Sequence, residues 1–527
     1  MLLLFGLNWG LKGQEVINIL RTNESIYDQA LYGKSTLLRG DVKIEYGGSI
    51  LTSDEVLVKD QNAGFEATKN VNINQGDSLF LKGDKATYTS ATKVAVVRNN
   101  VELEDKDLFL NGPQLNYNRA LSEAYYIDRS RIRIKKNNDF IESNFGHYYS
   151  LRHLLMFTDS VIYEAEDFTM SGNDLSYNTT NELISYTTGA TTIRKSDSSI
   201  FYSLKAQYYQ QTHEAYFYGN VVAFNDGLEF EADSVYYNDS TNIALAYNHI
   251  EMQDSINEWI LLAPYAENYR DNDSVSIPYR SEMIMLNGND SIHLFSDSLS
   301  IYGSNNAKTI LAKGNVTLNG KQFKGVCETL IYQQIDSTIT MLSAPVLWQD
   351  SSQIVGEKII LTLGEDGVKN MYIPRESFIT EKVGTGLYNQ IKGRELTAYF
   401  VDGKMNNIII KGNGQSIYHA FDEGKDASGK IQRKYIGVNQ SECSDMEIVM
   451  RIDEGGVASI KFLTKPENSL TPAAIIKASD SFFLKEFSWL ADKKPSLLND
   501  QSNFEWLFYP KIATKNIPLK DLEQDKN

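Results

Sequence analysis

The sequence predicts an all-β protein built from a repeated antiparallel unit, and three observations lead to that fold class. Apolar and polar residues alternate along short stretches, as at Val42, Ile44 and Tyr46, which is the two-residue period of a strand with one buried face. Aromatic residues make up 11% of the 527 residues and prolines number only ten, a composition that suits long ladders. Similar strand sequences return about every thirty residues. Because a hairpin cannot bury its apolar face alone, successive units must cover one another.

Two kinds of residue mark the repeat. An apolar residue opens one strand at intervals close to thirty residues, or twice that, and a tyrosine closes the second strand of the unit. A Gly-Asn or Gly-Asp pair before the opening residue supplies the positive φ that tight turns require, so we expect an opening strand, a turn and a second strand in each unit. The apolar markers are Val42, Val71, Val101, Val161, Val221, Ile250, Val316 and Val346, and the tyrosines include Tyr88, Tyr117, Tyr148, Tyr177, Tyr208 and Tyr236.

The first 410 residues fall into three segments. Residues 1–13 form a short apolar run that ends in small residues, and we interpret them as a signal-peptide remnant; a first strand or buried segment is the alternative. The repeats occupy residues 14–270 and continue through 271–410, with an irregular stretch between about 255 and 300.

The C-terminal part keeps the strand pattern but changes its sequence. Residues 411–495 are expected to hold further hairpins, the clearest at 446–463, followed by one short amphipathic helix at 479–492. Residues 496–527 are rich in charge and form a partly disordered tail in this prediction.

Composition excludes several function classes. The chain has 51 basic and 68 acidic residues, a net charge of −17, so we expect no nucleic-acid partner. Its densest basic stretch, residues 129–136, alternates like a strand with a solvated face. No later stretch reaches the roughly 18 uninterrupted apolar residues of a membrane helix.

The sequence offers no pattern for catalysis or metal binding. The six histidines lie far apart, and the Asp or Glu that recurs at the start of the second strand is interpreted as structural. Cys327 and Cys443 match no zinc motif; they either pair in an oxidising compartment or remain two free thiols. We therefore predict a protein that is not an enzyme and that needs no metal or cofactor.

The apolar residues of the opening strands are the candidate functional residues. They point to one face of their strands, which is either an ordinary packed core or the lining of a partly open trough for a long apolar ligand. The candidate lining residues are Val42, Ile44, Tyr46, Val71, Ile73, Val101, Leu103, Val221, Ala223, Val316, Leu318 and Val346.

The repeated sequences at 40–88, 217–238 and 310–332 resemble the OstA-like (organic solvent tolerance) repeat of periplasmic lipopolysaccharide-transport bridge proteins, in particular the enlarged members of Bacteroidetes type. The resemblance implies an elongated, repetitive antiparallel β-jelly-roll that forms an open, V-shaped trough. It also implies a periplasmic protein that carries lipopolysaccharide or lipooligosaccharide toward the outer membrane, with the acyl chains inside the trough.

The same resemblance implies the partners. These are other transport-bridge components, including the outer-membrane translocon, and further copies of the chain joined end to end, with any membrane association confined to the ends. The chain is several times longer than a minimal bridge module, and it lacks the additional strands of a membrane barrel, so it is not the translocon itself. The alternatives are a parallel β-helix of carbohydrate-active or adhesive type, and a scaffold with a closed core.

Overall fold

The computed structural model describes residues 16–76, 79–287, 290–303, 307–364, 367–425, 431–451, 457–477 and 480–496. Its described strands pair antiparallel, which confirms the predicted fold class and shows that the alternative of a parallel β-helix is wrong. The chain divides into two compact units, Met1–Asn242 and Ile243–Asn527. The predicted signal-peptide remnant and residues 497–527 of the predicted tail lie outside the described residues.

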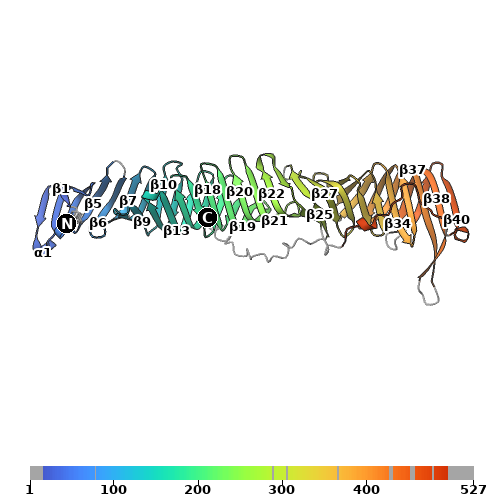
Figure 1. The fold of residues 1–527 in the computed structure, drawn as a ribbon, viewed down its shortest axis with the longest axis horizontal. Helices are drawn as coiled ribbons and strands as arrows, with labels where there is room; N and C mark the ends of the chain where they lie inside the picture. The colour runs from blue at the N-terminus through green and yellow to red at the C-terminus, as the bar shows by residue number, and fades with distance from the viewer. Residues whose placement is uncertain are drawn as a thin grey trace, which may run out of the picture. The chain divides into compact units, whose positions relative to one another are not determined.

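The strands of the first unit follow one another in chain order (Figure 1). Its elements are β1 (Asn18–Arg21), β2 (Glu24–Tyr27), α1 (Gln29–Tyr32), β3 (Thr36–Tyr46), β4 (Ser49–Val58), η1 (Asp60–Asn62), β5 (Gly64–Gln75), β6 (Leu79–Thr89), β7 (Val94–Asp105), β8 (Leu108–Asn118), β9 (Glu123–Tyr126), β10 (Ser130–Ile134), β11 (Phe140–Ser143), β12 (Phe145–Tyr149), η2 (Ser150–Arg152), β13 (Leu154–Glu164), β14 (Phe168–Asn178), β15 (Leu183–Tyr186), β16 (Ala190–Arg194), β17 (Ile200–Ser203), β18 (Lys205–Tyr209), β19 (Glu214–Asn225) and β20 (Leu228–Asn238).

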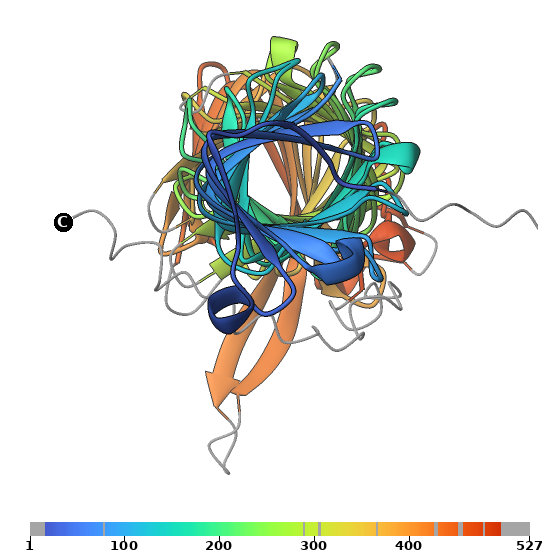
Figure 2. The ribbon, with the colours of Figure 1, turned by 90° about the vertical axis from the view of Figure 1, so that its left-hand side faces the viewer.

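The second unit continues the same pattern and ends in longer strands. Its elements are β21 (Ile243–Asp254), β22 (Trp259–Tyr269), η3 (Arg270–Asn272), β23 (Ser274–Ile277), β24 (Ser281–Asn287), β25 (Asp290–Ser296), β26 (Ser298–Tyr302), β27 (Thr309–Asn319), β28 (Lys324–Gln333), β29 (Thr338–Leu342), β30 (Val346–Gln349), β31 (Ser352–Val355), β32 (Lys358–Gly364), β33 (Gly367–Ile373), β34 (Ser377–Gly384), β35 (Leu387–Gly393), β36 (Glu395–Val401), β37 (Lys404–Lys425), β38 (Ile431–Met450), β39 (Val457–Leu463), β40 (Glu467–Pro472), η4 (Ala473–Ile475) and η5 (Ala491–Lys493). The β37–β38 hairpin projects from the roll (Figure 2).

Seven of the eight apolar marker residues lie inside long strands and do not open them as predicted, whereas Val346 is the first residue of β30. Val42 lies inside β3, directly after Gly40 and Asp41, whose φ angles are 76° and 43°. The register against β4 shifts between Arg39 and Val42, so these two left-handed residues form a bulge at which the strand bends. We call this bend the corner. Equivalent pairs with positive φ precede other markers, at 69–70, 99–100, 159–160, 248–249 and, with a glycine first, 219–220 and 314–315.

Each corner divides its strand into two halves. The two halves lie in two different layers, which we call wall A and wall B. Wall A contains 42–46 of β3 and 49–53 of β4, and wall B contains 36–39 and 55–58 of the same strands. Hairpin turns alternate between the free edge of wall A, as at 47–48, and the free edge of wall B, as at η1. We call the space between these two rows of turns the mouth. Each repeat of about thirty residues is thus one hairpin of two bent strands.

Small residues make room for the corner. Val42 stands opposite Ser53, Val71 opposite Gly83, and Val101 opposite Gly112 in the strand pairings. A Cβ atom at Gly83 would lie 2.4 Å from the Cγ1 atom of Val97, so a larger residue would have no room there. In β4 and β6 an Asp follows the small residue, and its carboxylate accepts a hydrogen bond from the next corner along the chain.

That carboxylate has the structural role that its recurrence predicted. The Asn70 side-chain amide donates to Asp54 at 2.9 Å, and the Asn100 amide donates to Asp84 at 2.8 Å. In each pair the asparagine is the second left-handed residue of its corner. The Asp therefore holds the positive-φ residue of the neighbouring strand in place.

The amphipathic helix predicted over 479–492 is wrong. Residues 480–490 contain no helix, and the helical turn in this region is the 3-10 turn η5. Two buried glutamines of the sheet hold the backbone of this segment extended. The Gln390 amide donates to the Phe482 carbonyl and accepts from the Leu484 N–H, and Gln353 binds Ser488 and Leu490 in the same way. These tertiary hydrogen bonds override the local helical pattern.

Candidate functional site

The apolar face predicted from the sequence is the interior between the two walls. Ile44, Leu51, Ile73, Leu81 and Leu103 stand in register on five successive strands, so they form one row along wall A. Because side chains two residues apart share a face, Val42, Val71 and Val101 extend the same surface toward the corner. Wall B presents further apolar side chains to the same core, including Leu38, Val56, Ala67, Ala86, Val97 and Leu115.

The structure places most of the predicted lining residues in this interior. Val42, Ile44, Tyr46, Val71, Val101, Leu103, Val221, Val316 and Leu318 are buried, and Ile73 and Ala223 are half-buried. In the second unit, Leu318 pairs with Gly325, and Gly325 pairs with Leu347. Alternation along β30 therefore puts Leu347, and not the predicted Val346, in the row of Leu318.

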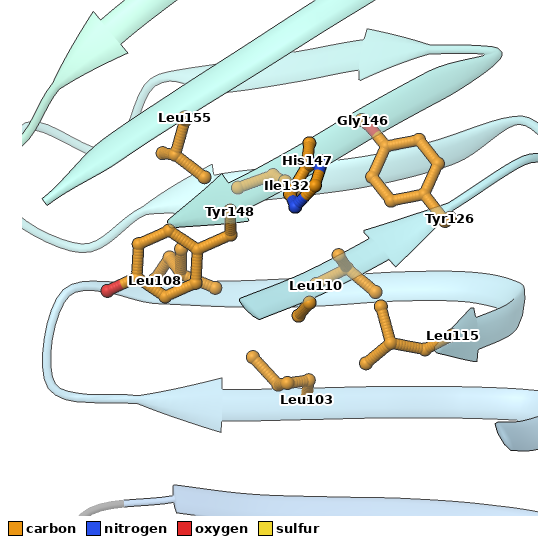
Figure 3. A pocket seen from close by; sticks show the side chains of 11 residues that line it. Leu103, Leu108, Leu110, Leu115, Tyr126, Ile132, Gly146, His147, Tyr148 and Leu155 are labelled. Carbon is orange, nitrogen blue, oxygen red and sulfur yellow. The ribbon is translucent and has the colours of Figure 1, made fainter. Parts of the chain in front are cut away.

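Side chains of the protein fill the interior of the first unit around Leu103. A cavity of only about 10 Å³ lies among Leu103, Leu110, Leu115 and Tyr126, about the space of one water molecule (Figure 3). Tyr126 donates to or accepts from Ser143 at 2.7 Å, and burial raises the pKa of its phenol to about 12. The interior is thus apolar, closely packed and, at this place, without room for a ligand unless the walls separate.

Side chains meet across the mouth, and we call each such contact a clasp. The hydroxyl oxygens of Tyr46 at the edge of wall A and Tyr88 at the edge of wall B are 3.4 Å apart. The Tyr117 hydroxyl donates to Gln75 at 3.3 Å. Both pairs are separated by 42 residues, so each contact joins the edge of wall A to the edge of wall B more than one hairpin further along the chain.

Each unit also has an ionic clasp. In the first unit the Lys136 ammonium at the edge of wall A binds the Glu182 carboxylate at the edge of wall B. In the second unit the Lys308 ammonium lies 2.9 Å from Asp254, and the exposed fractions of the two side chains are 18% and 5%. Neutral clasps accompany the second pair, since Gln334 binds Asn257 and the Gln349 amide donates to the Gly403 carbonyl at 2.7 Å.

The pKa shifts show which clasps carry charge. Hydrogen bonds from Lys136 and Gln211 hold the pKa of Glu182 below its usual 4.5. Burial alone would raise the pKa of Asp254, but hydrogen bonds from Asn257 and Lys308 bring it below its usual 3.8. Burial and the nearby Asp105 raise the pKa of Tyr148, so its phenol stays protonated at neutral pH. The mouth therefore contains both ion pairs and neutral phenols.

The segment 480–496, which we call the strap, covers the outer face of wall A in the second unit. Its backbone is bound by Gln390, Gln353, Lys324 and Asn319, in that order as the strap runs from 482 to 496. The pairings put Asn319, Lys324, Gln353 and Gln390 on one face, opposite Leu318 and Leu347. The strap therefore lies outside the roll. Its rings pack on Tyr388, with Phe487 at 5.2 Å and Trp489 at 5.4 Å between ring centroids.

Sequence reasoning found the tyrosines of the mouth only as markers of the repeat. Their regular spacing could have indicated the contacts across the mouth. A tyrosine that faces inward at the end of every second strand carries a hydroxyl that needs a hydrogen-bond partner or water. No regular spacing in the sequence marks the Lys, Glu and Asp residues of the ionic clasps. Among the described residues, no group of three His, Cys, Asp or Glu is placed to hold a metal ion. No helix of the described chain is long and apolar enough to cross a membrane.

Comparisons with known proteins match the chain in two segments. Residues 14–173 match the OstA-like protein family, and residues 202–366 match the family of LptA and LptD N-terminal domain lipopolysaccharide-transport proteins. Among solved structures, the chain is similar to LptH, the LptA-homologous periplasmic component of the lipopolysaccharide transport device of Pseudomonas aeruginosa. That similarity has 14% identity and a TM-score of 0.21, and it covers 22% of this chain and 95% of LptH. The comparison with curated proteins gives no match.

Proposed function

The chain belongs to the OstA-like family of lipopolysaccharide-transport proteins, and on that premise we propose that it carries lipopolysaccharide with the acyl chains between walls A and B. The observation that carries this proposal is the unbroken row of apolar side chains in register on successive strands, from Ile44 to Leu103. We propose that carriage involves no catalysis.

Burial of the acyl chains stabilises the lipid inside the protein. Each methylene removed from water contributes about 0.8 kcal/mol, so a lipid with several acyl chains cannot cross an aqueous compartment unshielded. Apolar positions that repeat once per hairpin give an acyl chain the same surroundings at each step. The lipid can then move along the row without a deep energy minimum.

The packed interior sets a condition on this function. Because the cavity near Leu103 holds about 10 Å³, acyl chains must displace wall B from wall A. The two walls are joined through the chain at the corners, while the turns connect strands within one wall. Opening at the mouth therefore breaks side-chain contacts and leaves the backbone ladders intact.

Site-specific photo-crosslinking tests the proposal. A photoreactive residue at Leu103 or Leu347 should capture lipopolysaccharide in cells, while Glu102 and Val346, adjacent positions on the opposite face, should not. Equal capture at Leu103 and Glu102, or none at either interior position, would contradict it. The Leu347 and Val346 pair gives the same comparison in the second unit.

The family also suggests where the chain works and which partners it contacts. We propose that the chain works in the periplasm and passes lipid to other bridge components, including the outer-membrane translocon, and that copies join end to end. A fused reporter that is active only after export should report activity. Crosslinking in cells should link strands β1 or β40, at the ends of the described ladder, to a second chain or to a bridge component.

A further inference from the structure

Among the described residues, each unit has an ionic clasp at the mouth, Lys136 with Glu182 and Lys308 with Asp254. Lys136 binds Glu182 over 46 residues of sequence, and Lys308 binds Asp254 over 54. Each joins the two walls at their free edges, where only side chains connect them. The Asp254 and Lys308 side chains are largely buried, so their attraction is screened less by water than that of a surface pair.

The carboxylates keep other hydrogen bonds if the ammonium groups leave. The Gln211 amide donates to Glu182 at 3.0 Å. The backbone N–H groups of Ile256 and Asn257 donate to Asp254 at 3.1 and 2.8 Å. Neither carboxylate is therefore stranded when its clasp opens, which lowers the cost of breaking the pair.

The ammonium groups are held at the place where a lipid head would lie. Lys308 lies 5.3 Å from the centroid of the Trp259 ring, an aromatic face that keeps the cation at the edge of the mouth. Lys136 is 66% exposed and can turn toward solvent. An amphiphile whose chains lie between the walls must project its head through the mouth, because the corner is closed by backbone.

We propose that the mouth of each unit is a lateral gate for an amphiphile with an anionic head. The clasps open as its chains enter, and the head replaces Glu182 at Lys136 and Asp254 at Lys308. This inference rests on the proposed function and adds the route of admission and the residues that bind the head. A phosphate or carboxylate on the head supplies the charge that the displaced carboxylate supplied before.

A crosslink across the mouth tests the gate. In the full chain, Asp254→Cys with Lys308→Cys, joined by a bismaleimide, locks the second unit, and the native cysteines are buried. With a photoreactive residue at Leu347 and purified lipopolysaccharide as the probe, we expect the lock to lower capture at least tenfold. The control joins Asn62→Cys to Ser90→Cys, neighbouring turns at one edge, with the photoreactive residue at Leu103, and should leave capture unchanged.

The outcomes separate the two proposals. Capture at Leu347 that is equal with and without the lock overturns the gate and leaves the carrier function standing, whereas no capture in the unlocked chain overturns both. The head-binding role is tested by Lys308→Met, with Lys313→Met in the adjoining strand β27 as control. The first should weaken capture of the phosphorylated lipid about tenfold and leave its dephosphorylated form unaffected; equal losses for both lipids would contradict head binding.

Discussion

Gln353 and Leu490 are joined by a hydrogen bond of 2.6 Å, from the Leu490 N–H to the Gln353 side-chain oxygen, across 137 residues of sequence. The Gln353 amide also donates to the Ser488 carbonyl at 2.9 Å. A buried side chain thus provides both bonds that a neighbouring strand would have given the strap.

Gln353→Met should release the middle of the strap. The substitution keeps the volume but leaves a backbone donor and acceptor without partners, which costs about 1–3 kcal/mol. We expect earlier proteolysis between 480 and 496 and a lower thermal midpoint. Gln415→Met, which loses only an exposed bond to Glu442, is the matched control. Unchanged proteolysis in Gln353→Met would contradict the role of this glutamine.

Gly83→Val should distort the corner of β6. A Cβ at this position lies 2.4 Å from Val97 Cγ1, and Val97 is fully buried, so the overlap should cost roughly 1–3 kcal/mol. Chemical denaturation measures the loss. Gly424→Ala, whose added Cβ meets no atom within 4 Å, should change stability little. Equal stability of the two variants would rule out close packing at the corner.

Asp174 should make the fold sensitive to acid. Burial alone would raise the pKa of its carboxyl, but hydrogen bonds from Thr188 and Thr187 bring the pKa below 3.8. A carboxyl with a lowered folded-state pKa stabilises the fold above its unfolded pKa and loses that effect as pH falls through the folded value. Asp174→Asn should therefore be less stable than the parent at pH 7, with the difference shrinking below about pH 4. A constant difference across this range, in urea unfolding, would refute the assignment.

Cys327 and Cys443 should resist alkylation in the native protein. Both are buried free thiols, and burial raises the pKa of Cys327 to about 12, so little thiolate forms at pH 8. Mass spectrometry after iodoacetamide treatment should show no adduct until the protein is unfolded. A native adduct on Cys327 would show that its strand opens readily.

The sequence predicted the period, the antiparallel class and most of the interior because these depend on local alternation. The alternation of Val42, Ile44 and Tyr46 predicts a buried face whatever the position of the strand in the fold. The pairs predicted to form turns lie at corners instead, because a Gly-Asp pair with positive φ suits a tight turn and a bulge equally well.

Other features depend on distant residues and could not be read locally. The contact between Lys136 and Glu182 depends on how far the edge of wall A is displaced along the chain from the edge of wall B. That displacement is determined by the folded structure and not by local sequence. The predicted helix failed at Phe482 and Leu484 because Gln390 binds their backbone groups. At Val346, four successive apolar or buried residues in β30 hide the alternation that separates the two faces.

The hairpin of two bent strands is also the unit by which the length of the protein can change. Inserting or deleting one such hairpin preserves every ladder on either side and changes the reach of its unit by two strand spacings, roughly 10 Å. Length in this architecture can therefore change during evolution in discrete increments of one hairpin.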